Sequence, residues 1–143
     1  RMKQHCSNAQ KVVDYLTKNK NVEKVIYPNL HTGEIGDRAK RYFNGGNGGL
    51  VGIEVKGGVE AGKKFIEALK MFYHVANIGD ARSLAIHPGT TTHSQLNEEE
   101  LLAAGVTPGY IRLSIGIEHP DDIIADLDQA LEASGKTNLK AVS

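Results

Sequence analysis

Apolar residues recur at helical spacing in several stretches of the chain, and each stretch predicts an amphipathic helix. The pattern is clearest near the two ends. The first stripe consists of Cys6, Ala9, Val12, Val13 and Leu16, and the last of Ile123, Ile124, Leu127, Ala130 and Leu131. The helices expected from this spacing are 2–19, 37–42, 59–72, 97–104 and 119–135.

Several residues at the ends of these helices have the chemistry of caps. Asp37 is expected to be the N-cap of the short second helix. Asn97 and Glu100, three positions apart, form a capping-box pattern, and Gly105 is placed to end that helix in a left-handed conformation. Gly135 is expected to end the last helix.

Alternating or β-branched apolar residues between the helices predict strands. The expected strands are 22–27, 50–56, 75–78, 83–86 and part of 109–120. Helices and strands therefore interleave, but some strand connections are too short for a parallel crossover, which needs a dozen or more residues. We expect an α+β fold, a two-layer arrangement with a mostly antiparallel sheet and helices on one face.

One arginine interrupts the last strand, which reads GYIRLSIGIEHP over residues 109–120. Alternation places Ile111, Leu113, Ile115 and Ile117 on one face and Arg112, Ser114, Gly116 and Glu118 on the other. An arginine flanked by small residues leaves room for a carboxylate to bind the guanidinium through two parallel hydrogen bonds. The alternative is that Arg112 pairs with Glu118 or with another carboxylate on an exposed sheet face.

Composition narrows the possible partners and compartments. The chain has 143 residues, the size of one domain, and we expect a folded unit at 1–135 followed by a loose tail at 136–143. Lys+Arg and Asp+Glu are both 17, so no net charge attracts nucleic acid. No apolar run is long enough for a membrane span, and the single Cys6 forms no internal disulfide, which favours the cytoplasm.

Other candidate sites have simpler interpretations. His87 and His93 have no cysteine nearby and no clear third ligand, so no metal site is expected. His5 and Cys6 are adjacent on a helix and point in different directions, which disfavours a shared metal or a nucleophile pair. The glycines at 45–49 lack the lysine and hydroxyl of a P-loop and precede a strand, so a flexible loop is expected.

Two stretches, taken together, resemble a known family. They are ANIGDARSL at 76–84 with IHPGTTTH at 86–93, and AAGVTP at 103–108 followed by the arginine strand. The sequence and spacing of the two stretches resemble the C-terminal domain of the Cys/Met-metabolism family of pyridoxal-phosphate enzymes. The resemblance extends from residue 1 to about residue 134. Within that family the sequence is most similar to the O-acetylhomoserine sulfhydrylase branch, which replaces acetate on O-acetylhomoserine with sulfide or a thiol.

The resemblance implies a fold and a set of site residues. The chain would be the small C-terminal domain of a fold type I enzyme, whose large domain holds the cofactor. Arg112 matches the arginine that holds the substrate's α-carboxylate, and Asn77 matches a position beside the cofactor that is commonly asparagine in the sulfhydrylase branch. Thr92 matches a threonine near the carboxylate site. Ser83 and His87 lie in the same run and are expected to be mainly structural.

The family's catalytic lysine is missing from this sequence. It lies in a Ser-x-Thr-Lys context in the large domain, and Thr17-Lys18, the nearest match, has Tyr15 in place of the serine. We therefore expect no catalytic residue and no bound pyridoxal phosphate in this chain, and an amino-acid substrate and the parent's large domain as its partners. The resemblance further implies a homotetrameric parent.

Two alternatives remain open. A cystathionine γ-synthase or γ-lyase of the same family would use the same arginine. A non-enzymatic amino-acid-binding module would bind a free amino acid and be monodisperse in solution. Helical periodicity is already running at Arg1, which favours a piece of a longer enzyme, and such a piece should expose an apolar face and self-associate.

Overall fold

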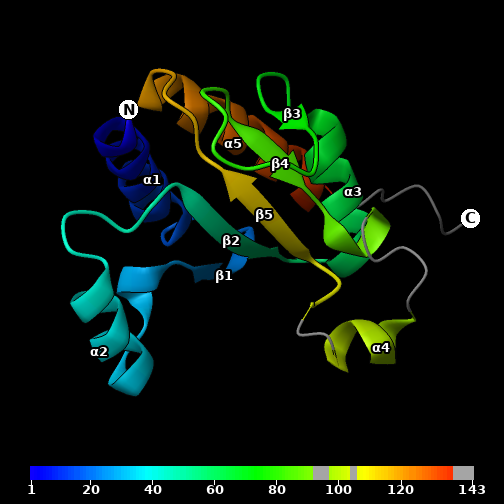
Figure 1. The fold of residues 1–143 in the computed structure, drawn as a ribbon. Coiled ribbons are helices and arrows are strands. Elements are labelled where there is room, and N and C mark those ends of the chain that lie inside the picture. The colour runs from blue at the N-terminus through cyan, green and yellow to red at the C-terminus, as the bar shows by residue number, and fades with distance from the viewer. Residues whose placement is uncertain (92–96, 104–105, 137–143) are drawn as a thin grey trace, which may run out of the picture.

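The fold is a five-stranded sheet covered by helices on one face (Figure 1). A computed structural model describes residues 1–91, 97–103 and 106–136. The strands are β1 (Val22–Ile26), β2 (Leu50–Val55), β3 (Tyr73–His74), β4 (Leu84–Ile86) and β5 (Tyr110–Ser114), in the order β1-β2-β5-β4-β3. All neighbours are antiparallel except β3 and β4, which run parallel.

Three helices form the layer behind the sheet in Figure 1. They are α1 (Met2–Leu16), α3 (Gly58–Ala68) and α5 (Pro120–Gly135), and α5 contacts both of the others. Helix α2 (Gly33–Tyr42) stands apart beyond β1, and α4 (Glu98–Ala103) lies on the far side of the molecule. Short 3-10 turns occupy Pro28–Leu30 and Pro88–Thr90. The α+β fold expected from the sequence is confirmed.

The core lies between the sheet and these three helices. Alternate residues of the two central strands point into it, so that Val51, Ile53, Ile111 and Leu113 have no exposed surface. The helices contribute the apolar stripes read from the sequence, among them Val12, Leu16, Phe65, Ile123, Leu127 and Leu131, which are equally buried. The opposite face of the sheet, here called the outer face, carries the polar members of the same alternation.

Helix α3 ends at Ala68, four residues before its predicted end at Phe72. Leu69 is already extended, and the next amides bind a carboxylate from α5 instead of helical carbonyls. The N–H groups of Lys70, Met71 and Phe72 donate to the buried side chain of Asp126 at 2.8 to 3.2 Å. A tertiary partner therefore ends this helix, although its apolar spacing continues.

The start of α2 also differs from the prediction. The helix begins at Gly33 with Thr32 at its N-cap, so Asp37 lies inside the helix and is not its cap. The Gly36 N–H donates to the Thr32 carbonyl at 3.3 Å, which closes the first turn before Asp37 is reached. The two glycines at 33 and 36 are more typical of a loop than of a helix start, so the sequence gives no sign of this turn.

The strand expected at 75–78 is wrong. Pairing occurs instead at Tyr73–His74, which runs parallel to Leu84–Ile86. The Asn77 N–H donates to the Val75 carbonyl at 3.0 Å, a tight local turn that leaves no ladder at these residues. The connection between these two parallel strands, residues 75–83, contains no helix and is shorter than a usual parallel crossover. Only two residues of each strand pair.

The capping box of α4 is confirmed. The Asn97 N–H donates to the Glu100 carboxylate and the Glu100 N–H donates to Asn97 Oδ1, both at 2.9 Å. Gly105, expected to end this helix, and residues 137–143 of the expected tail lie outside the described residues. Within the described part of the chain, no helix combines the length and the apolar character needed to cross a membrane.

Candidate functional site

The outer face of β5 carries Arg112 near the middle of the sheet. Its Cα is paired with Gly52 of β2 on one side and with Ile86 of β4 on the other. A side chain at Gly52 would lie 2.9 Å from the Tyr110 ring, so the glycine makes room for that ring across β2. The missing side chain therefore lets Tyr110 and Arg112 share this part of the outer face.

The guanidinium of Arg112 contacts the segment between β3 and β4. Its Nη2 donates to the Asn77 carbonyl oxygen at 3.2 Å. Among the described residues, no carboxylate lies within ion-pair distance of Arg112. Glu118, the partner considered from the sequence, accepts hydrogen bonds from Ser83 instead. The group thus keeps donors available for an external carboxylate.

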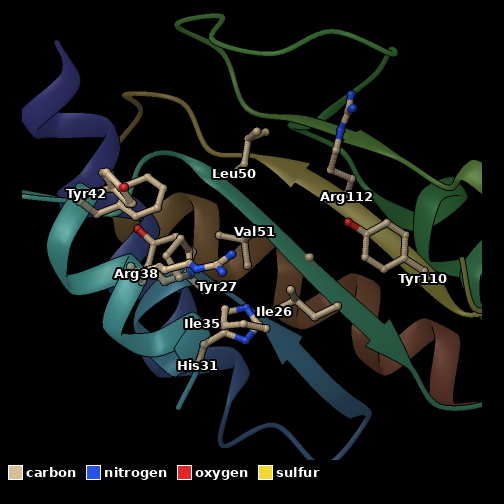
Figure 2. Close-up of a pocket in the computed structure, with 14 residues that line it drawn as sticks. Ile26, Tyr27, His31, Ile35, Arg38, Tyr42, Leu50, Val51, Tyr110 and Arg112 are labelled. Carbon is tan, nitrogen blue, oxygen red and sulfur yellow. The ribbon is translucent and has the colours of Figure 1, made fainter. Parts of the chain in front are cut away.

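A cavity of about 440 Å³ opens beside Arg112, between α2 and the outer face. Figure 2 shows Ile26, Ile35, Tyr42 and Tyr110 around it, while the Arg112 guanidinium points away from α2. A second cavity of about 430 Å³ is lined by Ile78, Gly79 and Ser114, and Leu50 lines both. One hollow with largely apolar walls is therefore lined by Arg112, and the other by the two residues that follow Asn77.

Burial and nearby charges affect the ionisable residues around Arg112 in different ways. Burial raises the pKa of Tyr110, while the positive charge of Arg112 partly opposes this shift and the Glu54 carboxylate adds to it. Across the cavity, Arg38 is neutralised by Glu34 at 2.6 Å. Of the two arginines that line this cavity, Arg112 is therefore the one that lacks a carboxylate partner within the described part of the chain.

The sequence-predicted site residues are only partly brought together. Asn77 lies against Arg112 through its backbone carbonyl, and its side-chain Oδ1 accepts the Ile78 N–H at 2.9 Å. Thr92 lies outside the described residues, so its predicted place near the carboxylate stays a prediction. The structure gives the geometry of Arg112 and Asn77, and their roles remain proposals.

Ser83 and His87 are both fully buried and hydrogen-bonded within the fold. His87 Nε2 donates to the Pro108 carbonyl at 2.7 Å, which leaves Nδ1 to accept from the Thr90 hydroxyl at 3.0 Å. Burial lowers the pKa of His87, an effect that the Pro108 hydrogen bond partly opposes. His93, considered with His87 as a metal ligand, lies outside the described residues, which contain no cluster able to hold a metal ion.

Three features beside Arg112 were not predicted from the sequence: Gly52, Tyr110 and the wall formed by α2. Tyr110 could have been found, because alternation places it on the same face as Arg112. Gly52 and α2 gave no local signal, since their places depend on strand register and on packing between distant segments.

Comparison with known proteins places these features in context. Residues 1–132 match the family described as Cys/Met metabolism PLP-dependent enzyme. The chain is 53% identical over 133 residues to an O-acetyl-L-homoserine sulfhydrylase of Leptospira meyeri, covering 92% of this chain and 30% of that protein. It is 45% identical to an L-methionine gamma-lyase of Fusobacterium nucleatum subsp. polymorphum, covering 92% of this chain and 33% of that protein.

A solved structure has the same fold. It is described as an O-acetylhomoserine (thiol)-lyase from Campylobacter jejuni and contains a pyridoxyl-lysine phosphate. The TM-score is 0.84 at 44% identity, over 92% of this chain and 31% of that one. The chain thus spans about a third of the length of the proteins it matches.

Proposed function

Because the chain belongs to the Cys/Met-metabolism family of pyridoxal-phosphate-dependent enzymes, we propose that it is the C-terminal domain of an O-acetylhomoserine sulfhydrylase. The parent enzyme would replace the acetate of O-acetylhomoserine with sulfide or a thiol, in cytoplasmic methionine or cysteine biosynthesis. Pyridoxal phosphate, held by the parent's large domain, would supply the electron sink for this exchange. The 53% identity to a sulfhydrylase supports this choice.

The part of this domain would be to bind and orient the substrate. Arg112 carries the proposal, because its guanidinium lies on the outer face without a described carboxylate partner and beside an open cavity. A carboxylate bound there by two parallel hydrogen bonds fixes the direction of the adjacent α-carbon. Asn77 and, by the family match, Thr92 would complete the wall around that carboxylate.

The cofactor's covalent anchor would come from outside this chain. Neither the cavity lined by Arg112 nor the one lined by Ile78 and Gly79 is lined by a lysine. The chemistry of the available groups suits a carboxylate and not an aldehyde. The donors that hold pyridoxal phosphate would therefore come from the large domain, and the isolated chain would be inactive.

A γ-lyase is the second candidate, because methionine γ-lyases match the chain at 41% to 45% identity. In such an enzyme Arg112 would have the same role. The two reactions differ in product: the lyase releases a 2-oxo acid and ammonia, whereas the sulfhydrylase keeps the amino group. Incubating the full-length protein with O-acetylhomoserine and sulfide, and measuring homocysteine and ammonia, separates them.

The central test is Arg112→Ala in the full-length protein that contains this chain. Removing the charged anchor of a bound carboxylate costs about 2 to 5 kcal/mol, so KM for the amino-acid substrate should rise about thirtyfold or more. KM for sulfide should change far less. Steady-state kinetics with each substrate varied in turn gives both values.

Arg38→Ala is the matched control, since Arg38 lines the same cavity but is already paired with Glu34. It should leave KM for the amino acid nearly unchanged. Equal increases for both substrates in the Arg112 variant, or the same increase in the Arg38 variant, would contradict a carboxylate role for Arg112.

A further inference from the structure

The segment between β3 and β4, residues 75–83, is fixed to the end of β5 at several points. Besides the contact of Arg112 with Asn77, the Gly79 N–H donates to Ser114 Oγ at 3.2 Å. The Ile117 N–H donates to the Ala81 carbonyl at 2.8 Å. Figure 1 shows this green segment between β3 and β4. The place of Asn77 thus depends on how firmly the whole segment is held.

Glu118 binds the last residue of that segment with both carboxylate oxygens. Oε1 accepts the Ser83 N–H at 2.6 Å, and Oε2 accepts the Ser83 hydroxyl at 2.9 Å. The same hydroxyl oxygen accepts the Gly116 N–H at 2.9 Å. Ser83 is fully buried and Glu118 is half-buried, so these hydrogen bonds are partly shielded from water.

The backbone approaches very closely at this point. A side chain on Gly116 would collide with the Glu118 carboxylate and with the backbone of Ala81, and would lie 2.6 Å from the carbonyl carbon of Arg82. Only glycine permits such contact. The segment therefore lies against Gly116 more closely than any other residue at that position would allow.

Helix α1 fixes the position of Glu118 from behind. Asn8, which is fully buried, donates through Nδ2 to the Gly116 carbonyl at 3.0 Å and to the Glu118 carbonyl at 2.8 Å. Within the described ranges, no cation pairs with the Glu118 carboxylate at 4 Å or less. Both oxygens of the carboxylate accept from Ser83, and hydrogen bonds to an ionised acceptor are stronger than those between neutral groups.

Building on the function proposed above, we infer that Glu118 is a positioning residue for substrate binding. Its carboxylate holds Ser83, and through Ser83 the 75–83 segment, where the Asn77 carbonyl meets Arg112. Without it, Asn77 and the Arg112 guanidinium lose their fixed relation, and the carboxylate site becomes less well ordered. Glu118 touches no substrate in this arrangement and acts through the segment alone.

The test is Glu118→Gln in the full-length protein. The amide keeps the shape, but its NH2 group can only donate where a carboxylate oxygen now accepts, so the Ser83 hydroxyl proton loses its acceptor and the remaining bond no longer ends on a charged group. KM for O-acetylhomoserine should rise about tenfold, because a hydrogen bond to a charged group is removed. KM for sulfide should stay within about twofold, as for a change that does not reach the nucleophile. Glu67→Gln, the same change at an exposed residue of α3, is the control.

Amide hydrogen exchange gives a readout that does not depend on turnover. In the Glu118 variant the N–H groups of Gly79, Ser83 and Ile117 should exchange at least about tenfold faster, while the core amides of β2 should not. Ser83→Ala removes the same hydroxyl bond from the other side and leaves the bond from the backbone N–H in place. The double variant should raise KM no more than the larger single change, because the two residues act through one contact.

Three results would overturn the inference: unchanged exchange at the segment, an unchanged KM for O-acetylhomoserine, or a lower melting temperature with neither effect. Arg112→Ala, measured in parallel, separates this outcome from failure of the proposed function. If the Arg112 variant raises KM and the Glu118 variant does not, only the positioning role fails. If neither raises KM, the carboxylate site itself is wrong.

Discussion

At the scale of single residues, His87 shows how a residue within a family motif can serve the fold. Its ring is fully buried, donates to the Pro108 carbonyl and accepts from Thr90, so it links β4 to the approach to β5. The neutral imidazole satisfies both contacts. A second proton would place a positive charge in the interior, which burial disfavours.

This burial predicts a pH dependence of stability. The pKa of His87 lies below its ordinary value of 6.5 in the folded chain, mainly because of burial, so the unfolded chain takes up the proton first as pH falls. The free energy of unfolding should therefore decrease as pH falls below about 6.5 and be independent of this group above that value. Urea unfolding between pH 5 and 8 measures the decrease.

An NMR titration of the His87 ring identifies the group responsible. In the folded chain its midpoint should lie below 6.5, and in the urea-unfolded chain near the ordinary value. A folded-state midpoint at or above the unfolded one would show that the interior does not disfavour the charged ring.

The alternation in the last strand was enough to place Arg112 on the outer face, since β5 keeps that register from Tyr110 to Ser114. The partners of Arg112 were not accessible in the same way. The contact with Asn77 joins residues 35 positions apart and depends on a loop whose path follows from tertiary hydrogen bonds. Alternation predicts the face of the sheet on which a side chain lies, but it does not predict which distant residues that side chain contacts.

At the scale of elements, the packing of α3 depends on a glycine in its middle. Gly62 is buried where the helix crosses the His87 ring, and a Cβ there would lie 2.8 to 3.1 Å from ring atoms. Helix propensity alone favours alanine at this position. The close approach of the helix to His87 opposes that preference.

We therefore predict that Gly62→Ala destabilises the chain, by about 1 to 3 kcal/mol, because the ring and the helix must move apart. Propensity alone predicts a gain of up to about 1 kcal/mol. The midpoint of urea unfolding distinguishes the two signs. Ser7→Ala, at an exposed position of α1, is the control and should stabilise by a few tenths of a kcal/mol.

A stabilised Gly62 variant would mean that α3 moves away from His87 at little cost. In that case the buried ring would not set the spacing between this helix and the sheet.

The ends of elements were less predictable than their existence. The apolar stripes of α1, α3 and α5 gave all three core helices, because burial on one side fixes a helical period. The end of α3 depends on Asp126, which lies far along the chain and binds three successive amides. The start of α2 depends on a turn between Thr32 and Gly36, and the glycines there are more typical of a loop than of a helix.

At the scale of the whole molecule, large apolar side chains gather around α2 and the outer face. Ile35, Tyr42, Phe43 and Leu50 are each at least 43% exposed, and all four line the cavity beside Arg112. A surface of this kind on one side of a folded chain is typical of an interface. It fits the proposal that a large domain covers this side.

The isolated chain should accordingly self-associate through this surface. Ile35→Lys places a charge in its centre and should reduce the self-association, as measured by sedimentation velocity over a range of concentrations. Leu102→Lys is the matched control, because Leu102 is 57% exposed but lies on α4, away from α2 (Figure 1).

A chain that stays monomeric at all concentrations would favour the amino-acid-binding module over a domain of a larger enzyme. Equal effects of the two lysine substitutions would place the association elsewhere.

The parallel pairing of β3 with β4 has a consequence for how the substrate site tolerates change. Both strands run in the same direction, so residues 75–83 must return the chain to the level at which β3 began before β4 can start. With Tyr73 and Ser83 fixed at the two ends, the number of residues in this return path decides where Asn77 stands. Deleting a single residue there would draw the Asn77 carbonyl away from the guanidinium even if every side chain were kept.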